Sequence, residues 1–196
     1  TRWRHCIHQP PDRDYAEKRT AALVAAPLRS LGIEVQENVG GIPGVVGILK
    51  GGKPGPTVAL RADMDALPVT EMVDVPYKSM VRTVYNGQET GVMHACGHDT
   101  HVAMLLGGAR LLVARREQLE GRVLLMFQPG EEGFAGARFM LEEGMLDLPA
   151  AEAANAAFAI HISTSYPTGT LNLRPGPEMA AADFIRLTVR GRGGHA

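Results

Sequence analysis

Residues 93–101 read MHACGHDTH and place three imidazoles, a thiol and a carboxylate in one short segment of a chain that has 7 histidines and 2 cysteines. Cys96 and His98 are two positions apart, so their side chains lie on the same side if the segment is extended. Thiolate and imidazole are ligands that zinc and similar divalent ions accept in proteins. An isolated pair of this kind is more often a small buried cysteine beside a hydrogen-bonded loop histidine. The pair is therefore a candidate metal site only if other ligands join it.

Glu131 and Glu132 stand next to each other in PGEEG, directly after an apolar run. Adjacent side chains of an extended chain diverge, so one carboxylate can bind a metal while the other faces a metal-bound water. Metal-assisted hydrolysis needs this division, because the metal lowers the pKa of water to about 7 and a carboxylate then takes the proton. A solvated acidic turn is the alternative, but the apolar residues before the pair favour a site.

Three further groups contain candidate residues, and the first two follow apolar runs. Asp63 and Asp65 in RADMDALP have the two-residue spacing that puts both on one side, where one can hydrogen-bond a ligating histidine and fix its tautomer. Capping a turn before Pro68 is the structural alternative. His161, in AAFAIHI, would by itself be interpreted as a core histidine, and only the other clusters make it a candidate ligand. His195, in RGRGGHA, follows glycines that let the backbone turn and present its imidazole.

The elements that must position these residues alternate along the chain. Residues 15–31 predict an amphipathic helix with Pro27 as a kink and Gly32 as its stop. Residues 100–115 predict a second helix with Asp99 or Thr100 as N-cap. Strands are predicted at 33–39, 45–51, 57–63, 121–128, 156–162, 168–174 and 184–190, and a short helix at 136–144. This order predicts an α/β fold with a mostly parallel mixed sheet flanked by helices, whose chemistry lies beyond the carboxyl ends of the strands.

Composition excludes several partner classes. The net charge of -1, without a Lys/Arg run, gives no electrostatic footprint for nucleic acid or an anionic membrane. No apolar run approaches the roughly 18 residues of a membrane span, and the opening TRWRHCIHQPPDRD has no hydrophobic signal region. We therefore expect a cytoplasmic protein with free cysteines and a small-molecule partner. Because the chain lacks an initiator Met and stops at RGRGGHA, we expect both ends to be cut.

The chain resembles the M20 metallopeptidases, in particular the amidohydrolase branch of hippurate hydrolases, N-acyl-amino-acid deacylases and auxin-conjugate hydrolases. The resemblance spans almost the whole chain in the order of the family. Its stretches are RHCIHQPPDRDYAEKRTA, LRADMDALPV, MHACGHDTHVAMLLGGARLL, GRVLLMFQPGEEGFAGARFMLEEG and FIRLTVRGRGGHA.

The resemblance implies a zinc-exopeptidase-like catalytic domain that holds two divalent ions, Zn²⁺ or Mn²⁺, with Co²⁺ or Ni²⁺ as further options. The matching ligands are Cys96, His98, Glu132 and His161. Glu131 matches the general base, and Asp65 matches the residue that orients the site, whereas Asp63 replaces a histidine of other branches and is not expected to be a ligand. His195 matches a residue of the lid and dimerisation domain that reaches the partner subunit's site and stabilises the oxyanion.

The implied domain boundary lies between residues 1–180, the N-terminal part of the catalytic domain, and 181–196, the first strand and turn of an inserted α+β lid domain. The implied activity is hydrolysis of N-acyl amino acids by a homodimer joined through the lid. The pattern departs from the family where HxxPE reads HQPPD, and the family's last histidine ligand lies beyond residue 196. Two alternatives remain: a metal-binding protein without catalytic activity, and a hydrolase with Cys96 as nucleophile and His98 or His161 as base.

Overall fold

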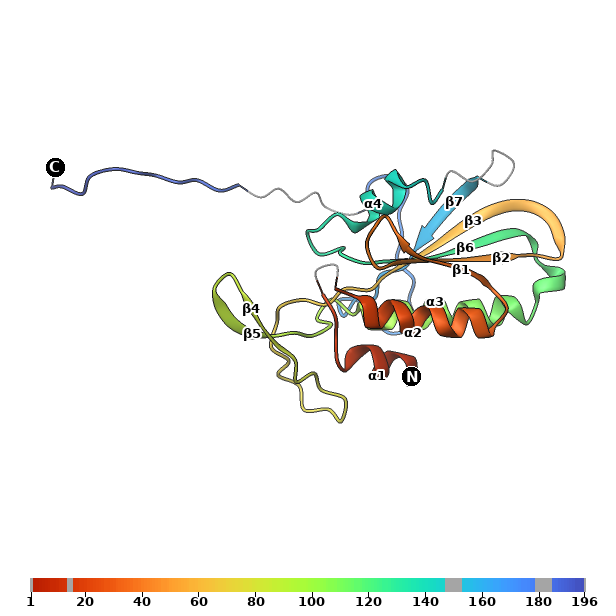
Figure 1. Ribbon diagram of the computed structural model, residues 1–196, viewed down its shortest axis with the longest axis horizontal. Helices are drawn as coiled ribbons and strands as arrows, with labels where there is room; N and C mark the ends of the chain where they lie inside the picture. The colour runs from red at the N-terminus through yellow and green to blue at the C-terminus, as the bar shows by residue number, and fades with distance from the viewer. Residues whose placement is uncertain (1, 14–15, 147–152, 179–184, 196) are drawn as a thin grey trace. The chain divides into compact units, whose positions relative to one another are not determined.

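A five-stranded sheet with helices on both faces organises the chain (Figure 1). The computed structural model describes residues 2–13, 16–146, 153–178 and 185–195. The strands are β1 (Glu34–Val39), β2 (Gly44–Lys50), β3 (Lys53–Asp63), β6 (Glu120–Gln128) and β7 (Ala154–Ala159), in the order β1-β2-β6-β3-β7. β3 pairs with β6 and with β7 in parallel, whereas β2 pairs with β1 and with β6 antiparallel. The predicted α/β fold with a mixed sheet flanked by helices is confirmed. Two of its four strand pairings are parallel, those within β6-β3-β7, so the sheet is less parallel than expected.

The two faces of the sheet carry separate hydrophobic cores because successive strand residues point to opposite sides. In β6, Val123, Leu125 and Phe127 pack on the face covered by α1 (Arg2–His8), α2 (Lys18–Ser30) and α3 (His98–Val113). Leu124 and Met126 lie on the other face together with Met140 of α4 (Gly136–Glu142). A strand buried on both faces has the continuous apolar sequence seen in VLLMF.

The predicted helices form at nearly the expected positions. α2 contains Pro27 and ends before Gly32, which has a φ of 70° as the predicted stop requires. α3 begins at His98, so the prediction of Asp99 or Thr100 as N-cap is wrong. Gly97 occupies the N-cap position with a φ of 85°, and this left-handed turn brings the chain into the helix earlier than the sequence pattern indicated.

Several elements of the structure were not predicted from the sequence. These are α1, the 3-10 turn Arg116–Gln118, and a hairpin of β4 (Arg82–Tyr85) and β5 (Gln88–Gly91). The hairpin turn is made by Asn86 and Gly87, which both have positive φ. Asn-Gly at this place is the residue pair that two-residue hairpin turns favour, so the signal was present in the sequence.

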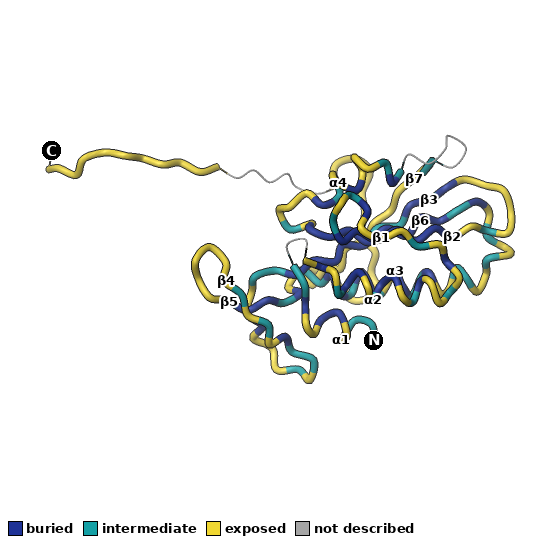
Figure 2. The backbone as a smooth tube through the Cα atoms, in the orientation of Figure 1, coloured by how far each residue is buried: buried dark blue, intermediate teal, exposed yellow. Residues whose placement is uncertain are grey.

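The predicted strands after β6 behave differently from expectation. β7 is the edge strand and is largely exposed, with Phe158 at 59%, so the prediction of a buried strand at 156–162 is wrong in its burial (Figure 2). Residues 168–174 and 185–190 form no strand. Ile185, Leu187 and Val189 keep a two-residue alternation, yet each is at least 85% exposed. A strand needs a hydrogen-bonded neighbour, and no segment among the described residues pairs with these two.

Residues 1–162 and 163–196 form two separate units. All elements named above belong to the first unit, and the second is irregular where the structure describes it. The predicted domain boundary at 180/181 lies outside the described residues. Among the helices that are described, none combines the length and apolarity needed to cross a bilayer.

Helix α1 is joined to the start of α3 by a buried polar network. His8 lies between two carboxylates, with its Nδ1 2.8 Å from Asp99 and its Nε2 3.1 Å from Glu71. Asp99 also accepts a hydrogen bond from Arg4 at 3.1 Å. The hydrogen bond to Asp99 raises the pKa of His8, opposed by burial and aided by Glu71. These contacts make the position of the first α3 turn depend on the N-terminal helix.

The first prediction concerns His8. Because its pKa is higher in the folded than in the unfolded protein, its contribution to stability is complete below about pH 6.5 and is lost as the pH rises through the folded value. We expect His8→Gln to lower the free energy of unfolding more at pH 6 than at pH 9. Urea unfolding of metal-free protein at both pH values measures this, and an equal loss at both values would contradict the charged network.

The second prediction compares two glycines. A Cβ on Gly121, which has a φ of 81°, would lie 1.8 Å from the carbonyl oxygen of Pro56, whereas a Cβ on Gly107 in α3 meets nothing within 4 Å. We expect Gly121→Ala to destabilise the fold by more than about 1 kcal/mol. Gly107→Ala should stabilise it by up to about 1 kcal/mol, because alanine favours helix. Thermal unfolding of the matched pair checks both signs.

Candidate metal centre

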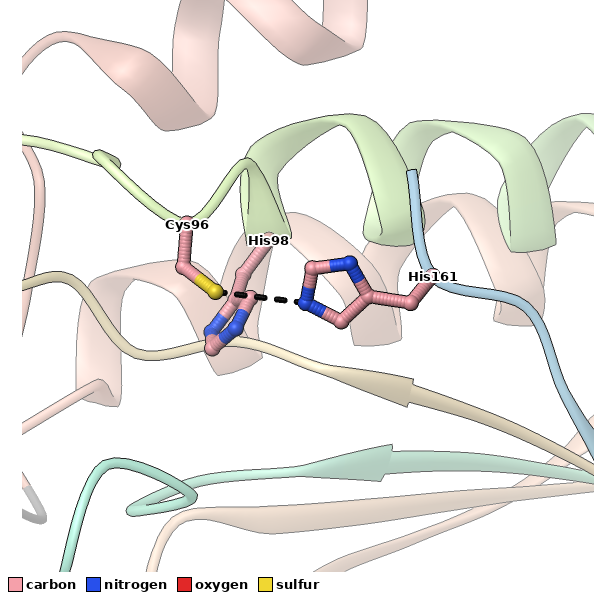
Figure 3. A group of neighbouring side chains, drawn as sticks. All are labelled: Cys96, His98 and His161. Carbon is pink, nitrogen blue, oxygen red and sulfur yellow. Dashed lines mark hydrogen bonds between the residues drawn. The ribbon is translucent and has the colours of Figure 1, made fainter. Parts of the chain in front are cut away.

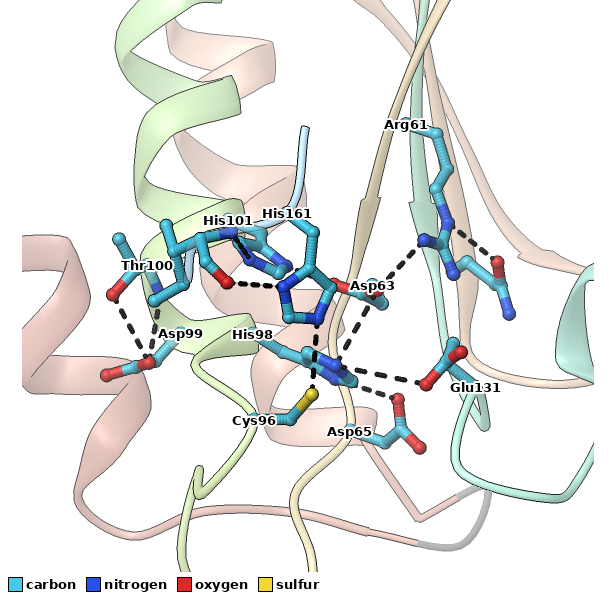
Figure 4. A network of polar contacts seen from close by, with 12 residues as sticks. Arg61, Asp63, Asp65, Cys96, His98, Asp99, Thr100, His101, Glu131 and His161 are labelled. Atoms are coloured by element: carbon cyan, nitrogen blue, oxygen red, sulfur yellow. Dashed lines mark hydrogen bonds and ion pairs between the residues drawn. The ribbon is translucent and has the colours of Figure 1, made fainter. Parts of the chain in front are cut away.

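The polar clusters meet at one edge of the sheet because β6, β3 and β7 are parallel neighbours. Asp63 ends β3, and Asp65 lies two residues further. Glu131 and Glu132 follow the end of β6, and His161 follows the end of β7. Cys96 and His98 reach the same place from the N-terminus of α3 (Figure 4). The structure thus brings together six of the seven predicted site residues, namely Asp65, Cys96, His98, Glu131, Glu132 and His161. The seventh is His195.

Cys96, His98 and His161 form the first of three overlapping groups (Figure 3). Each offers one ligand atom, and these atoms all lie within 4.8 Å of one another. Cys96 Sγ is 3.2 Å from His161 Nε2. The Nδ1 of His161 lies 2.6 Å from the carbonyl oxygen of Ile162, so it must carry the ring proton and donate it. Neutral His161 therefore presents the lone pair of its Nε2 to the site.

The second group is Asp63, His98 and His101, and the third is His98, Glu131 and Glu132. His98 is therefore the residue that all three groups share. It is fully buried, and neither ring nitrogen makes a hydrogen bond within the described part of the chain. Its Nδ1 lies 3.3 Å from Asp65, at ion-pair distance. Its Nε2 faces carboxylate oxygens of Glu131 at 3.9 Å and Glu132 at 3.8 Å. A buried ring nitrogen surrounded by anions is an orphaned polar atom that a cation would satisfy.

Acidic neighbours set the charge of this region. Burial opposes a charge on His98, but Asp65, Cys96 and Asp63 outweigh it and raise its pKa to about 10. The acidic neighbours thus favour positive charge at the ring, which a divalent ion would provide by replacing the proton.

The two glutamates differ in their surroundings. Burial, together with repulsion from Glu132, raises the pKa of Glu131, as expected of a group that accepts and returns a proton. The backbone N–H of Glu132 donates to Asp65 at 2.9 Å, and Glu132 Oε1 is buried with no hydrogen-bond partner in the described residues. Asp65 therefore contacts both His98 and the loop that carries the glutamates.

Asp63 pairs with His101 and Arg61, which are outside the predicted ligand set. It lies 2.6 Å from Nδ1 of His101 and 2.9 Å from Arg61. Burial raises its pKa, but the hydrogen bond from His101 and the charge of Arg61 outweigh this and lower it to about 2. Asp63 also lies 3.6 Å from Nε2 of His98, so the expectation that it is not a ligand stays a prediction.

These donors fit divalent ions. The set of thiolate, imidazole and carboxylate is the one that zinc and related ions accept, and the second nitrogen of each candidate histidine faces a carboxylate or a backbone carbonyl, as ligating histidines require. Cys96, His98, Glu132 and His161 are the residues that would hold the ions.

Other histidines lie outside this set. His94, in the same motif, is 5% exposed, both of its ring nitrogens lack hydrogen-bond partners among described residues, and burial lowers its pKa to about 4. His195 lies exposed in the second unit, so its predicted catalytic role stays a prediction. No specific role was expected for His101 from the sequence. Its spacing of three from His98 nevertheless puts both residues on one face of α3.

Comparisons with known proteins agree with this chemistry. The family model described as peptidase family M20/M25/M40 matches residues 59–193. Thermostable carboxypeptidase 2 of Saccharolobus solfataricus is 52% identical over 98% of this chain and 46% of its own length. An IAA-amino acid hydrolase of Arabidopsis thaliana is 43% identical over 98% of this chain and 41% of its own length.

A solved structure shares the fold. The Bacillus subtilis YXEP protein, described as a dinuclear metal binding peptidase from the M20 family, superposes with a TM-score of 0.80 at 38% identity, covering 90% of this chain and 45% of that chain. The chain thus spans about half the length of the relatives it matches. The chain belongs to the M20 family of metal-dependent hydrolases, as the family match and these identities show.

Proposed function

We propose that the protein is an amidohydrolase that cleaves the amide bond between an acyl group and an amino acid. The observation that carries the proposal is the convergence of Glu131 and Glu132 on the buried Nε2 of His98, with Cys96 and His161 beside it. We propose two divalent ions per subunit, Zn²⁺ or Mn²⁺, with Co²⁺ or Ni²⁺ as alternatives that availability would decide. The metal content of the relative from Bacillus subtilis, described as dinuclear, supports the number.

The proposed mechanism gives each residue of the site a separate role. When bound, the ions lower the pKa of water to about 7 and polarise the scissile carbonyl. Glu131, with its raised pKa, takes a proton from the attacking water and delivers it to the nitrogen of the leaving amino acid. Asp65 lies at ion-pair distance from Nδ1 of His98 and accepts a hydrogen bond from the backbone N–H of Glu132, so its role is to position both. We propose that His195 of a partner subunit polarises the carbonyl oxygen.

Two substrate classes are possible, acyl–amino acid conjugates and peptides, and they differ in the group joined to the nitrogen of the amino acid. The name of the Arabidopsis relative points to an acyl–amino acid conjugate, whereas that of the Saccharolobus relative points to a peptide. Both substrates contain an amide whose nitrogen belongs to an amino acid with a free carboxylate. A panel of N-acetyl amino acids, N-benzoyl amino acids and N-blocked dipeptides would rank the classes. The homodimer and the cytoplasmic location belong to the same proposal.

A cysteine nucleophile is the competing function, and one contact favours it. Cys96 Sγ lies 3.2 Å from His161 Nε2, within reach of a base. That mechanism leaves the glutamate pair and Asp65 without a role. Chelation should abolish turnover and added Zn²⁺ or Mn²⁺ should restore it if the metal mechanism holds. Activity that survives chelation but is lost on thiol alkylation would establish the nucleophile instead.

The third prediction tests the base. We expect Glu131→Gln in the full-length protein to lower kcat/KM for N-acyl amino acids by about 10²–10⁴-fold, because the amide cannot accept the proton. Metal content should be unchanged. Glu142→Gln, at an exposed position of α4 that pairs with Arg138, is the matched control and should keep full activity. Retained hydrolysis by Glu131→Gln would refute the assignment.

The fourth prediction tests the orienting carboxylate. We expect Asp65→Asn to weaken metal binding by about 10–100-fold, because His98 and the Glu132 backbone lose a shared charged acceptor. Competition with a chromogenic chelator measures the affinity. Asp74→Asn, at an exposed position, is the control and should bind as the unchanged protein does. An Asp65→Asn protein with unaltered affinity would show that the residue is only structural.

A further inference from the structure

We propose that His101 is a positioning residue, which connects buried Asp63 to the backbone of Ile162 and thereby fixes the segment that presents His161. The inference rests on the proposed role of His161 as a metal ligand. Three observations carry it: the hydrogen-bonding direction through the His101 ring, the contacts of Ile162, and the burial of His101 and Asp63.

The direction of the hydrogen bonds fixes the His101 tautomer. The backbone N–H of Ile162 can only donate, and it lies 3.0 Å from Nε2 of His101, so that nitrogen must be the acceptor. The proton of the neutral ring is then on Nδ1, which donates to Asp63 at 2.6 Å. Asp63 is in turn held by Arg61 at 2.9 Å. The buried carboxylate thus selects the ring form that accepts from Ile162 (Figure 4).

Ile162 is held at three points and leaves His161 little freedom. Its N–H is bound by His101, and its carbonyl oxygen accepts from Nδ1 of His161 at 2.6 Å. Its side chain lies so close to Gly97 that a Cβ there would be 2.3 Å from its Cδ1. The rings of His101 and His161 meet edge to face with their centroids 4.6 Å apart. β7 ends at Ala159, so these contacts, and not strand pairing, set the orientation of His161.

This role is needed because His161 comes from an exposed edge strand. His101 is 3% exposed and lies in the first turns of α3, whereas the residues at the end of β7 are exposed. Asp65, two residues beyond the end of β3, performs the matching task for His98. Each proposed histidine ligand therefore has a separate buried carboxylate behind it: Asp65 directly, and Asp63 through His101.

Two substitutions separate positioning from packing. Glutamine can place an acceptor where Nε2 of His101 lies but loses the contact at Nδ1, whereas asparagine can keep the contact with Asp63 but does not reach Ile162. We expect His101→Asn to lower the affinity of the full-length, metal-depleted protein for Co²⁺ by about 10–100-fold and to alter the visible absorption of the bound ion. His101→Gln keeps an acceptor for the Ile162 N–H but gives up the contact with Asp63, so it should lose less affinity than His101→Asn and change the spectrum less.

The probe is Co²⁺ alone, titrated and followed by absorption, with thermal unfolding of the metal-free variants measured alongside. Equal losses of affinity in both variants, losses that follow the loss of metal-free stability, or an unchanged His101→Asn would each overturn the inference. His161→Ala, titrated in parallel, must also lose affinity. If it does not, the ligand assignment of the proposed function fails, whereas a loss in His161→Ala without one in His101→Asn refutes the positioning role alone.

Discussion

The parallel pairing of β3 with both β6 and β7 is the constraint on which the site depends. It brings Asp63 and Asp65, the Glu131–Glu132 pair and His161 to one edge of the sheet, although β3 and β7 are far apart in the sequence. α3 then supplies Cys96 and His98 at the same edge, because a left-handed Gly97 ends the incoming loop and starts the helix. Backbone hydrogen bonding in the sheet therefore determines which side chains can share an ion.

Buried carboxylates control the histidines around this edge. Asp65 faces Nδ1 of His98, Asp63 faces Nδ1 of His101, and Asp99 faces Nδ1 of His8. Each contact directs one nitrogen of a ring toward a fixed partner and so determines what the other nitrogen can do. The three pairs link α1, α3 and β3 through groups that are costly to bury alone. The same polar contacts thus serve the stability of the fold and the orientation of the candidate ligands.

Much of the fold could be predicted from hydrophobic spacing. The VLLMF run of β6 and the helical pattern of α2 and α3 depend on local periodicity, which the sequence displays directly. The burial of a strand was harder to predict. The apolar β7 sequence indicates a buried strand, yet β7 is the exposed edge of the sheet described. Burial depends on what covers a strand, and neighbours distant in sequence decide that. For the site, residue types and strand-end positions identified the cluster, but they gave no role to His101.

The sequence alone determined the chemistry that is possible here, because thiol, imidazole and carboxylate groups follow apolar strands in a pattern shared with the M20 family. It also determined the α/β character, because helices and strands have different hydrophobic periods. Only the tertiary structure decided which partners each of these groups faces. Asp63 and Asp65 have the same spacing and type in sequence, but one faces Arg61 and His101 while the other faces His98 and the Glu132 backbone. That difference arises from the distances between strands and helix, which no local pattern encodes.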